Sequence, residues 1–467
     1  MKVEQIYTNC LAEAAYYIES EGEAIVIDPM RESYPYLERA EKDGAKIKYI
    51  LETHFHADFV SGHIDLAKKS GATIVYGPTA KPSYEVHIAE DGEELSVGKL
   101  KIRVLHTPGH TVESTTYLLL DKNGKEQAIF TGDTLFIGDV GRPDLAVKSD
   151  LSQDDLAGML FDSLRNKIMT LPPEITVYPA HGAGSACGKN LSTDTTDTLG
   201  NQLKFNYALR ASMTREEFIA EVTDGLMAPP QYFPKNAVLN KEGYDSLDEI
   251  LDRSAKALSL DEFKEFREQG ALILDTRSQA EYVKAHVPKS MFVGRDGTFA
   301  SWVGTLVEDL RQPIVLIAED NMEEEVVTRL SRVGYDNVLG HLEGGFSTWE
   351  KSEEVAQTES ISAESFKERY DEGDLNSLDV RKTSEYETEH VLAIENFPLD
   401  FIHDHIAELD ASKKYHVHCL GGYRSVIACS IMEQYGIVNT VNIEGGYKAV
   451  SQTGLPLSQF QEQNTAL

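Results

Sequence analysis

Short apolar runs separated by polar turns dominate the first 240 residues of the chain. Each run has the length and the β-branched content of a buried strand, and helical stretches lie between several of them. Most of the runs end on a histidine or an acid, as in EAIVIDP (23–29), KYILETH (48–54), KIRVLHTPGHT (101–111), QAIFTGD (127–133) and EITVYPAHG (174–182). The pattern predicts an α/β scaffold that displays polar side chains where its strands end.

The second half of the chain contains an internal repeat. LILDTRSQAEYVKAHVPKSMFV (272–293) aligns with NSLDVRKTSEYETEHVLAIENF (376–397), and LEGGF (342–346) aligns with IEGGY (443–447). The first pair shares Asp275/Asp379, Arg277/Arg381, Glu281/Glu385, Tyr282/Tyr386 and His286/His390. A repeat of about a hundred residues suits an independent α/β domain. We therefore predict a large domain over 1–240, a linker over 241–257, and two smaller domains over 258–352 and 357–467.

The composition is acidic: 467 residues include 44 Lys and Arg against 77 Asp and Glu, a net charge of −33. This balance would repel phosphate backbones and anionic membrane surfaces, so neither nucleic acid nor a membrane is an expected partner. No window approaches the roughly 18 apolar residues of a membrane span, and no signal-peptide-like stretch opens the sequence. The cysteines, too scattered for a disulfide framework, favour a cytoplasmic location; they are Cys10, Cys187, Cys419 and Cys429.

Candidate metal ligands end four separate segments of the large domain. Imidazole and carboxylate groups are ligands suited to zinc or non-haem iron. The segment THFHADF carries three of them and then Phe59, which cannot bind a metal. The candidates are His54, His56 and Asp58 in this segment, His110 in HTPGHT, Asp133 in FTGDT and His181 in YPAHG.

The order THxHxD, TPGHT, FTGDT and YPAHG resembles the metallo-β-lactamase superfamily, specifically its glyoxalase II-like branch. The resemblance covers residues 1–240 and implies a four-layered αββα sandwich with its site at one edge of the sheets. In the two-metal hydrolases of that branch the loop reads THxHxDH, and its last two residues help to hold the second metal. Phe59 replaces that final histidine here.

THFHADFVSG and FTGDTLFIGDVGRPD also resemble segments of the persulfide dioxygenases, which belong to the same superfamily. A one-metal oxygenase needs only two histidines and a carboxylate, which leaves positions open for substrate and O₂. The resemblance implies one Fe(II) per chain at His54, His110 and Asp133. The remaining candidates would orient these ligands or persist from a second metal site; they are His56, Asp58 and His181.

Three further residues lie beside the ligand segments. Arg142 in GDVGRPD and Tyr178 in VYPAH could position an anionic sulfur substrate, or be a surface arginine and a packed tyrosine. Cys187 in GAGSACGKN follows His181 by six residues. This stretch resembles fused members of the persulfide dioxygenase group, in which the cysteine would carry or receive a persulfide. A small buried hydrophobic residue is the alternative.

Cys419 has a different setting, between a predicted buried strand and a helix expected to open near Ser425. The spacing C-x₄-R, with Gly421 and Gly422 inside, places the sulfur among backbone N–H groups beside a helix N-terminus and Arg424. These features stabilise a thiolate and then a persulfide. Together with LDVR, the Glu385–His390 run and IEGGY, the segment resembles a rhodanese domain.

The first copy of the repeat lacks this chemistry. Its equivalent stretch is IVLIAEDNMEEEVV, in which the cysteine position falls at Ile317 or Ala318 and the arginine is absent. The acids that follow would repel thiosulfate or sulfite. We expect an inactive rhodanese domain used for spacing or docking.

The two resemblances together imply a persulfide dioxygenase fused to a sulfurtransferase, an enzyme of sulfide detoxification. It would oxidise the terminal sulfur of a small-molecule persulfide to sulfite with O₂, and Cys419 would form or use thiosulfate. Glutathione, coenzyme A, another small thiol or a partner protein could carry the persulfide. The alternatives are a two-zinc thioesterase of the glyoxalase II type with a sulfurtransferase tail, and a non-enzymatic sulfur carrier or sensor. APPQYFP (228–234) could serve an interface in a homo-oligomer.

Overall fold

The computed structural model describes residues 1–146, 151–373 and 375–458. The chain divides into two compact units. The first unit contains residues 1–250 and the later segment 328–335. The second unit contains residues 251–327 and the described residues from 336 onward.

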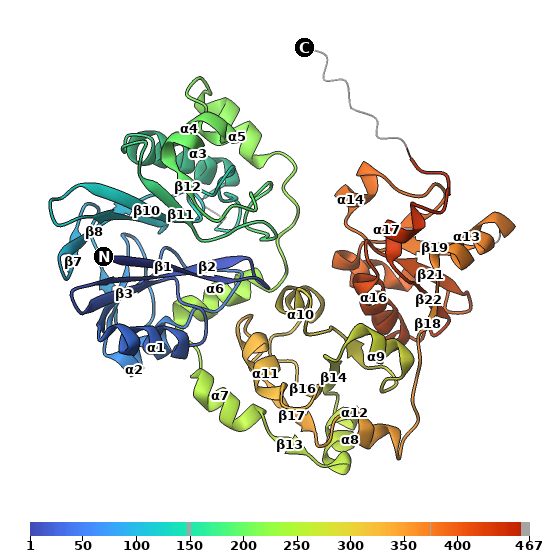
Figure 1. The fold of residues 1–467 in the computed structure, drawn as a ribbon. Coiled ribbons are helices and arrows are strands. Elements are labelled where there is room, and N and C mark those ends of the chain that lie inside the picture. Colours follow the sequence, from blue (N-terminus) through green and yellow to red (C-terminus); the bar gives the residue numbers. More distant parts are fainter. Residues whose placement is uncertain (147–150, 374, 459–467) are drawn as a thin grey trace. The chain divides into compact units, whose positions relative to one another are not determined.

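Two six-stranded sheets form the centre of the first unit (Figure 1). The first sheet has the order β1 (Lys2–Thr8), β2 (Glu13–Ser20), β3 (Glu23–Ile27), β4 (Lys46–Leu51), β5 (Thr73–Tyr76) and β6 (His87–Ile88). The second has the order β12 (Asp197–Thr198), β11 (Thr176–Pro179), β10 (Glu126–Gly132), β9 (Thr115–Leu120), β8 (Leu100–His106) and β7 (Glu94–Val97).

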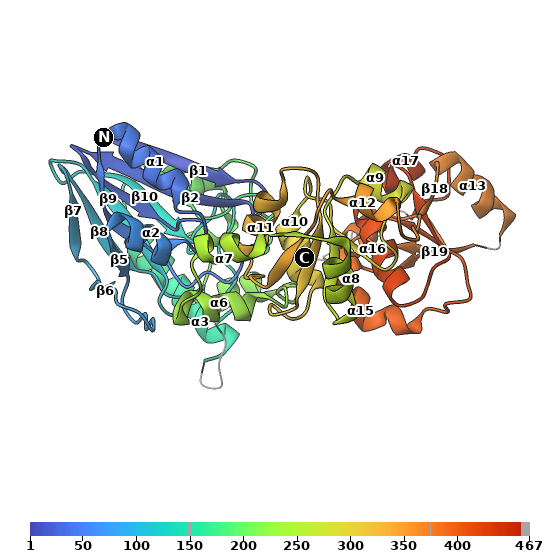
Figure 2. The same cartoon turned by 90° about the horizontal axis from the view of Figure 1, so that it is seen from below.

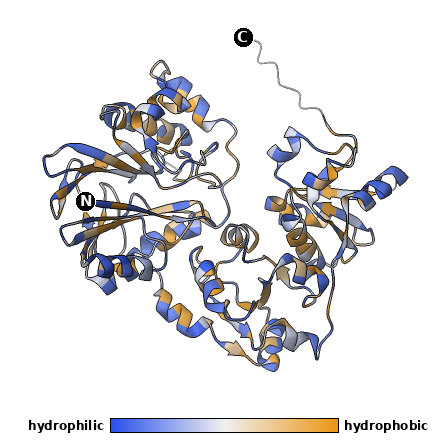
Figure 3. Ribbon diagram, in the orientation of Figure 1, coloured by the Kyte–Doolittle hydropathy of each residue, from blue (hydrophilic) through white to orange (hydrophobic). Residues whose placement is uncertain are grey.

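Helices cover the outer faces of both sheets, which gives four layers. Residues of α1 and α2 pack on the first sheet, and residues of α3, α4 and α5 pack on the second. Figure 3 shows hydrophobic and hydrophilic residues mixed along these covering helices. The predicted αββα sandwich is confirmed. The helices of this part are α1 (Tyr34–Asp43), α2 (His63–Ser70), α3 (Gln153–Ser163), α4 (Leu199–Phe205), α5 (Arg215–Thr223), α6 (Phe233–Glu242) and α7 (Leu247–Ser254).

Strand β2 illustrates why both faces of the first sheet are apolar. Tyr16 and Ile18 belong to the core between the two sheets, whereas Ala15 and Tyr17 belong to the core under α1 and α2. Successive side chains of a strand point to opposite faces, so a strand covered on both sides must be apolar throughout.

One edge of the second sheet collects three of the predicted ligand segments. Strands β8, β10 and β11 run in the same direction, so their carboxyl ends meet at that edge. His110, Asp133 and His181 follow these three ends. The segment 52–63 follows β4 of the other sheet.

The second unit confirms the internal repeat, because it contains two five-stranded parallel sheets with the same strand order. The first copy has the order β13 (Ala257–Leu258), β17 (Val338–Leu342), β16 (Ile314–Ile317), β14 (Leu272–Asp275) and β15 (Met291–Phe292). The second has the order β18 (Glu359–Ile361), β22 (Thr440–Ile443), β21 (Tyr415–His418), β19 (Asn376–Asp379) and β20 (Glu395–Asn396).

The helices repeat as well. Those of the first copy are α8 (Leu260–Glu268), α9 (Gln279–Lys284), α10 (Phe299–Leu306), α11 (Glu323–Ser331) and α12 (Phe346–Glu350). Their counterparts are α13 (Ala363–Glu372), α14 (Thr383–Thr388), α15 (Ile402–His405), α16 (Tyr423–Gln434) and α17 (Gly446–Val450). Figures 1 and 2 both place α9 of the first copy beside α16 of the second.

The segment expected to be a linker, 241–257, has its own structure. It contains the end of α6, the whole of α7 and the start of β13. Among the residues that the structure describes, no helix combines the length and the apolar character that a bilayer crossing requires.

Candidate metal centre and cysteine loop

His54, His110 and Asp133 form one buried cluster at the edge of the sandwich. One possible ligand atom from each lies within 4.8 Å of the others. His110 Nε2 is 3.3 Å from Asp133 Oδ2. The fold therefore brings together three residues that are 56 and 23 positions apart in the sequence.

Two of the histidines are oriented by backbone carbonyls. The carbonyl oxygen of Arg142 lies 2.8 Å from His110 Nδ1, and that of Ala12 lies 3.2 Å from His181 Nδ1. A carbonyl oxygen can only accept, so Nδ1 carries the hydrogen in both rings. In the neutral form of each ring the lone pair is then on Nε2, on the side of the cluster, which is how hydrogen-bond partners of metal-binding histidines orient them.

His54 reaches the same state through a hydroxyl group. Its Nδ1 lies 3.0 Å from Thr53 Oγ1, and this hydroxyl donates at 2.8 Å to Asp28. Burial, and then the neighbouring histidines, lower the pKa of His54 well below its usual value. The imidazole is therefore neutral, as a metal ligand must be.

A second cluster of possible ligands, His56, Asp58 and His181, adjoins the first. His181 Nε2 joins the two, at 3.3 Å from Asp58 Oδ2 and 3.5 Å from Asp133 Oδ1. His56 Nε2, however, lies 3.1 Å from Asp28. Burial disfavours the charged ring, but Asp28 and Glu52 outweigh it and raise the pKa of His56 to about 9. A protonated imidazole has no lone pair for a metal.

Phe59 occupies the place next to this second cluster. Its side chain has 0% of its surface exposed, and its ring centre lies 4.3 Å from that of His56. The ring therefore fills space that a ligand side chain would otherwise share with His56, and it adds no donor atom.

Several buried polar atoms in these clusters fit a bound cation. Both carboxylate oxygens of Asp133, both of Asp58, and Nε2 of His181 lie buried without a hydrogen bond to any residue that the structure describes. Such atoms are costly in a folded protein unless something else satisfies them. Two imidazoles and one carboxylate suit iron(II), so the donor set at His54, His110 and Asp133 fits that ion.

Cys187 lies beside the same centre. Its sulfur lies within 4.8 Å of possible ligand atoms of Asp133 and His181. Burial, and then Asp58 and Asp133, raise the pKa of the Cys187 thiol well above its usual value. A cation among these acids would reverse the sign of their effect on the thiol.

The structure assigns other contacts to Arg142 and Tyr178. The Arg142 guanidinium is buried, pairs at 2.7 Å with Asp144 and donates to the carbonyl groups of Ala186 and Met227. These contacts tie the loop that carries Cys187 to the loop that orients His110. Tyr178 stacks on Phe130, with ring centres 5.0 Å apart, as part of the core between the sheets.

In the second unit, Cys419 is buried at the end of β21, in a turn that leads into α16. The Gly422 backbone N–H donates to its Sγ at 3.1 Å, and Ser425 Oγ lies 3.7 Å from it. Gly422 adopts a φ of 106°, a conformation that favours glycine. The helix begins at Tyr423, two residues before the position expected from the sequence, because this turn ends the loop early.

Arg424 and Gly421 complete the turn around Cys419. The Arg424 guanidinium binds both carboxylate oxygens of Glu385, at 2.6 and 2.9 Å. A Cβ atom at Gly421 would meet no atom within 4 Å, so space is open there. The turn thus combines the buried sulfur of Cys419, the Gly422 N–H that donates to it and the guanidinium of Arg424, which Glu385 holds in place.

Both units of the chain are similar to known proteins. Residues 8–181 match the metallo-beta-lactamase superfamily, and residues 259–352 and 362–453 match the rhodanese-like domain. The Mus musculus protein named persulfide dioxygenase ETHE1, mitochondrial, is 31% identical over 215 residues, which cover 44% of this chain and 73% of that protein. The chain belongs to the metallo-beta-lactamase superfamily. It carries two rhodanese-like domains in addition.

Other relatives of the superfamily have similar identity. The Arabidopsis thaliana protein named hydroxyacylglutathione hydrolase cytoplasmic is 32% identical over 180 residues, covering 38% of this chain and 66% of that protein. A solved metallo-beta-lactamase from Staphylococcus aureus subsp. aureus COL has a TM-score of 0.64 at 30% identity, covering 73% of this chain and 98% of that one. The chain spans 59% to 66% of the length of the first four curated relatives.

The two rhodanese-like copies keep the same framework around different loops. Arg277 Nη2 pairs with Asp275 and Arg381 Nη2 pairs with Asp379, both at 2.6 Å. Since β16 ends at Ile317 as β21 ends at His418, the position of Cys419 corresponds to Ala318 in the first copy. Of the two positions that the sequence left open, the structure therefore selects Ala318.

The metal centre also depends on residues that could not be recognised from the sequence. Asn240, in α6, donates to the carbonyl groups of His56 and Phe59, both at 2.7 Å, and accepts from the Ser61 N–H at 2.9 Å. From segment 328–335, the Arg332 carbonyl accepts from the Val60 N–H at 2.7 Å. These residues lie far from the metal loop in sequence and carry no motif.

Buried acids near the centre were also missed. Glu13, which pairs with His181 in an isolated β-bridge, is fully buried, as are Asp28 and Glu52. Burial, and then Asp28 and other acids, raise the pKa of Glu13 well above its usual value. Asp28 and Glu52 each end an apolar run, EAIVIDP or KYILETH, and that position was an available signal.

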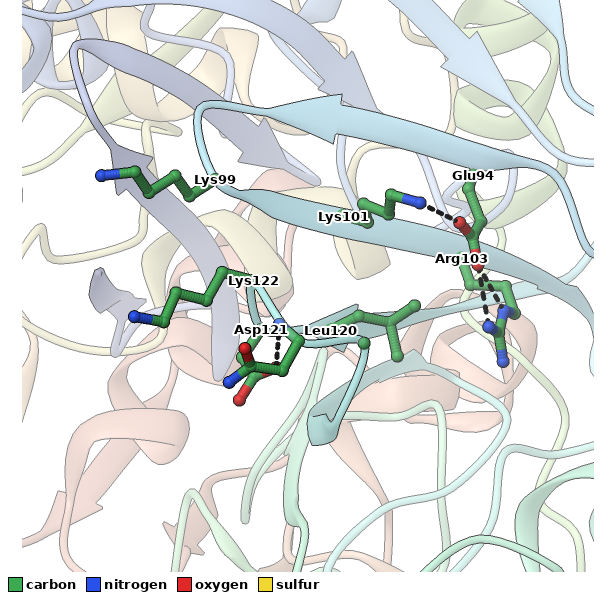
Figure 4. Close-up of a pocket in the computed structure, with 9 residues that line it drawn as sticks. Glu94, Lys99, Lys101, Arg103, Leu120, Asp121 and Lys122 are labelled. Atoms are coloured by element: carbon green, nitrogen blue, oxygen red, sulfur yellow. Dashed lines mark hydrogen bonds and ion pairs between the residues drawn. The ribbon is translucent and has the colours of Figure 1, made fainter.

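A surface hollow of about 310 Å³ lies at the other end of the second sheet (Figure 4). It is lined by the β7–β8 and β9–β10 turns, whereas His110 and Asp133 follow the opposite ends of β8 and β10. Lys101 and Arg103 there both pair with Glu94. The hollow contains no residue of the two metal clusters.

Proposed function

We propose that this chain oxidises the terminal sulfur of a small-molecule persulfide to sulfite with O₂, and transfers sulfane sulfur through Cys419. One R–S–SH, one O₂ and one water would give one R–SH and one sulfite with two protons. Oxygen is reduced in this reaction, the terminal sulfur is oxidised, and the S–S bond is broken.

The observation that carries the proposal is the cluster of His54, His110 and Asp133 next to a second cluster in which Phe59 packs on His56 and His56 Nε2 lies 3.1 Å from Asp28. Two imidazoles and one carboxylate leave several positions open on a single iron, as non-haem Fe(II) oxygenases require. A hydrolase that uses two metals would need the second cluster as well.

The chain's own residues would hold one Fe(II) at the Nε2 atoms of His54 and His110 and at a carboxylate oxygen of Asp133. When bound, the ion supplies open positions at which O₂ and a sulfur anion can meet. Thr53 and the Arg142 carbonyl keep both imidazoles in the required tautomer. The buried ring of Phe59 excludes water and a second cation from the neighbouring space.

Cys187 would exchange sulfur with a persulfide at the centre, and its closeness to Asp133 and His181 supports this role. Arg142 would act on it indirectly, since its backbone N–H donates to the Cys187 carbonyl at 3.0 Å. Tyr178, which packs against the core between the two sheets, would support the site through this packing.

For Cys419 we propose the transfer half of the reaction. Sulfite attacks the outer sulfur of the Cys419 persulfide and the S–S bond breaks. Thiosulfate is released, and the sulfur of Cys419 remains on the chain as a thiolate. The Gly422 N–H donates to that sulfur, and Arg424 supplies a fixed positive charge in the same loop. Both groups favour a negative sulfur over a neutral one.

The test is O₂ uptake by iron-loaded protein supplied with glutathione persulfide, with sulfite measured as the product. We expect one O₂ consumed per sulfite formed, and one iron per chain by elemental analysis. Failure of the iron-loaded protein to consume O₂ with any small persulfide would contradict the proposal.

A two-zinc thioesterase is the second candidate, favoured by the cluster of His56, Asp58 and His181 and by the similarity to a hydroxyacylglutathione hydrolase. It predicts two zinc ions per chain and hydrolysis of S-acyl thiols without O₂. Elemental analysis separates it from the iron oxygenase. A sulfur carrier without catalysis, the third alternative, predicts that Cys419→Ser abolishes function while His54→Ala has no effect.

A further inference from the structure

The first rhodanese-like copy contacts the cysteine loop of the second copy directly. The side-chain amide of Gln279, the first residue of α9, donates to the Gly422 carbonyl at 3.1 Å. Gly422 is the residue whose N–H donates to Cys419 Sγ. A residue of the copy that lacks a cysteine therefore holds the residue that contacts the sulfur of the other copy.

The next residue of the loop is held by a niche in the first copy. The Tyr423 hydroxyl donates to the Gly294 carbonyl at 2.8 Å. A Cβ atom built on Gly297 would lie 2.6 Å from Tyr423 Cζ, and one on Gly294 would lie 3.3 Å from Tyr423 Cε2. A side chain at position 297 would therefore displace the ring, and one at position 294 would crowd it.

The same contact surface continues along α16. Ser430 Oγ accepts from the Phe292 N–H at 3.0 Å. The Glu433 carboxylate lies 2.9 Å from His286 Nε2 and accepts from the Lys289 N–H at 3.0 Å. The helix that follows Cys419 is thus fixed to the first copy near its start, its middle and its end.

We propose that the first rhodanese-like copy positions the cysteine loop of the second, through Gln279 and through the Gly294–Gly297 niche for Tyr423. Gln279 is a positioning residue that acts on Cys419 through Gly422. The value of this role for sulfur transfer rests on the proposed function of Cys419. The role itself concerns the geometry of the loop and has its own readouts.

The position of Gly422 matters because its N–H is a direct hydrogen-bond donor to the sulfur of Cys419. The Gly422 N–H is effective only while the turn keeps its distance of 3.1 Å from Sγ. Gly422 has no side chain, and glycine has the widest backbone freedom of any residue. External contacts at its carbonyl and at Tyr423 restrict that freedom before substrate arrives, which is preorganisation of the site.

The test uses the full chain with Gln279→Ala and Gly297→Ala, and with Gln312→Ala as the matched control. Gln312 is another glutamine of the first copy that donates to a backbone carbonyl, that of Gly270, at 3.0 Å. Three quantities are measured: hydrogen exchange of the peptide that spans 419–425, the rate of Cys419 alkylation by iodoacetamide from peptide mass spectrometry, and sulfur transfer from thiosulfate to cyanide.

We expect both test variants to exchange faster in 419–425 and to lose about fivefold in alkylation rate and in kcat for sulfur transfer, the size of one ordinary hydrogen bond. KM for thiosulfate should change little if Gln279 acts only through the Gly422 carbonyl. Gln312→Ala should match the wild type in all three. If the test variants match Gln312→Ala in exchange and alkylation, the positioning role is wrong.

Tyr423 gives a second, independent check. Tyr423→Ala should reproduce the loss seen with Gly297→Ala, and the double variant should be no worse than either single one, because both remove the same contact. Additive losses would contradict the niche. If the wild type transfers no sulfur although loop exchange responds as expected, the proposed function of Cys419 fails while the positioning role stands.

Discussion

At the scale of single residues, Asp133 links the two clusters of the metal centre. One of its oxygens lies 3.3 Å from His110 Nε2, and the other lies 3.5 Å from His181 Nε2. Because both oxygens are buried, an uncompensated negative charge there would be costly to the fold. A cation bound beside these oxygens would compensate that charge.

We expect His110→Ala to reduce bound metal at least about tenfold, since removing a ligand is at least as costly as removing one of its outer partners. His106→Ala is the matched control. This histidine lies on the same strand-to-loop segment, but its ring contacts the Val112 carbonyl at 2.9 Å. Elemental analysis of both purified variants checks the prediction, and equal metal loss in the two would contradict the assigned ligand.

His416 carries a prediction about pH. Burial, and then Arg369, lower the pKa of His416 from 6.5 to about 4. The His416 imidazole therefore binds a proton more tightly in the unfolded chain than in the folded one. As a result, the free energy of unfolding falls as the pH falls from 6.5 toward 4. The loss reaches up to about 2 kcal/mol at pH 5.

Urea titrations of the full chain at pH 7.5 and pH 5, with both unfolding transitions followed, measure this loss in wild type, His416→Gln and His405→Gln. We expect His416→Gln to have a smaller pH dependence than the wild type. His405, an exposed histidine beside Glu408, serves as the control. An unchanged pH dependence in His416→Gln would rule out this histidine as the source.

At the scale of secondary-structure elements, helix α6 braces the metal loop. Asn240 makes three hydrogen bonds to residues 56–61 of that loop. Asn240→Ala would leave buried backbone groups without partners, which costs about 1–3 kcal/mol for each strongly affected group. We expect a clear loss of stability and weaker metal binding, measured by thermal unfolding and by competition with a chelator.

Asn236, one helical turn earlier, is the matched control. It is fully buried, yet neither atom of its amide makes a hydrogen bond to a residue that the structure describes. Asn236→Ala removes the same group without breaking such a bond, so we expect a smaller effect. A larger loss of metal affinity from Asn236→Ala than from Asn240→Ala would contradict the bracing role.

The sequence was sufficient for those parts of the site that follow strand ends. The runs that lead to His110, Asp133 and His181 converge because parallel strands end at one edge of a sheet. His54 follows β4 of the other sheet and joins them from there. Asn240 and Arg332 could not be predicted, since they reach the loop through tertiary packing and lie in segments without a motif. The raised pKa of His56 could not be predicted for a related reason: it depends on Asp28, which follows another strand.

At the scale of the whole molecule, the two units should respond separately to metal. An ion that binds only the folded first unit stabilises that unit by mass action and leaves the second unchanged. We expect calorimetry of the full chain to show two transitions, of which removal of iron by a chelator lowers only one. A shift of both by the same amount would mean that the units unfold together.

The first unit is discontinuous in sequence, and this affects how the protein is made. On the ribosome, the metal loop emerges long before Arg332, whose carbonyl receives the Val60 N–H and whose side chain pairs with Glu32. Until residues 328–335 have been translated, the nascent loop lacks this brace. The segment that binds metal is therefore completed by residues translated late, and an early stop codon before residue 328 would leave it unfinished.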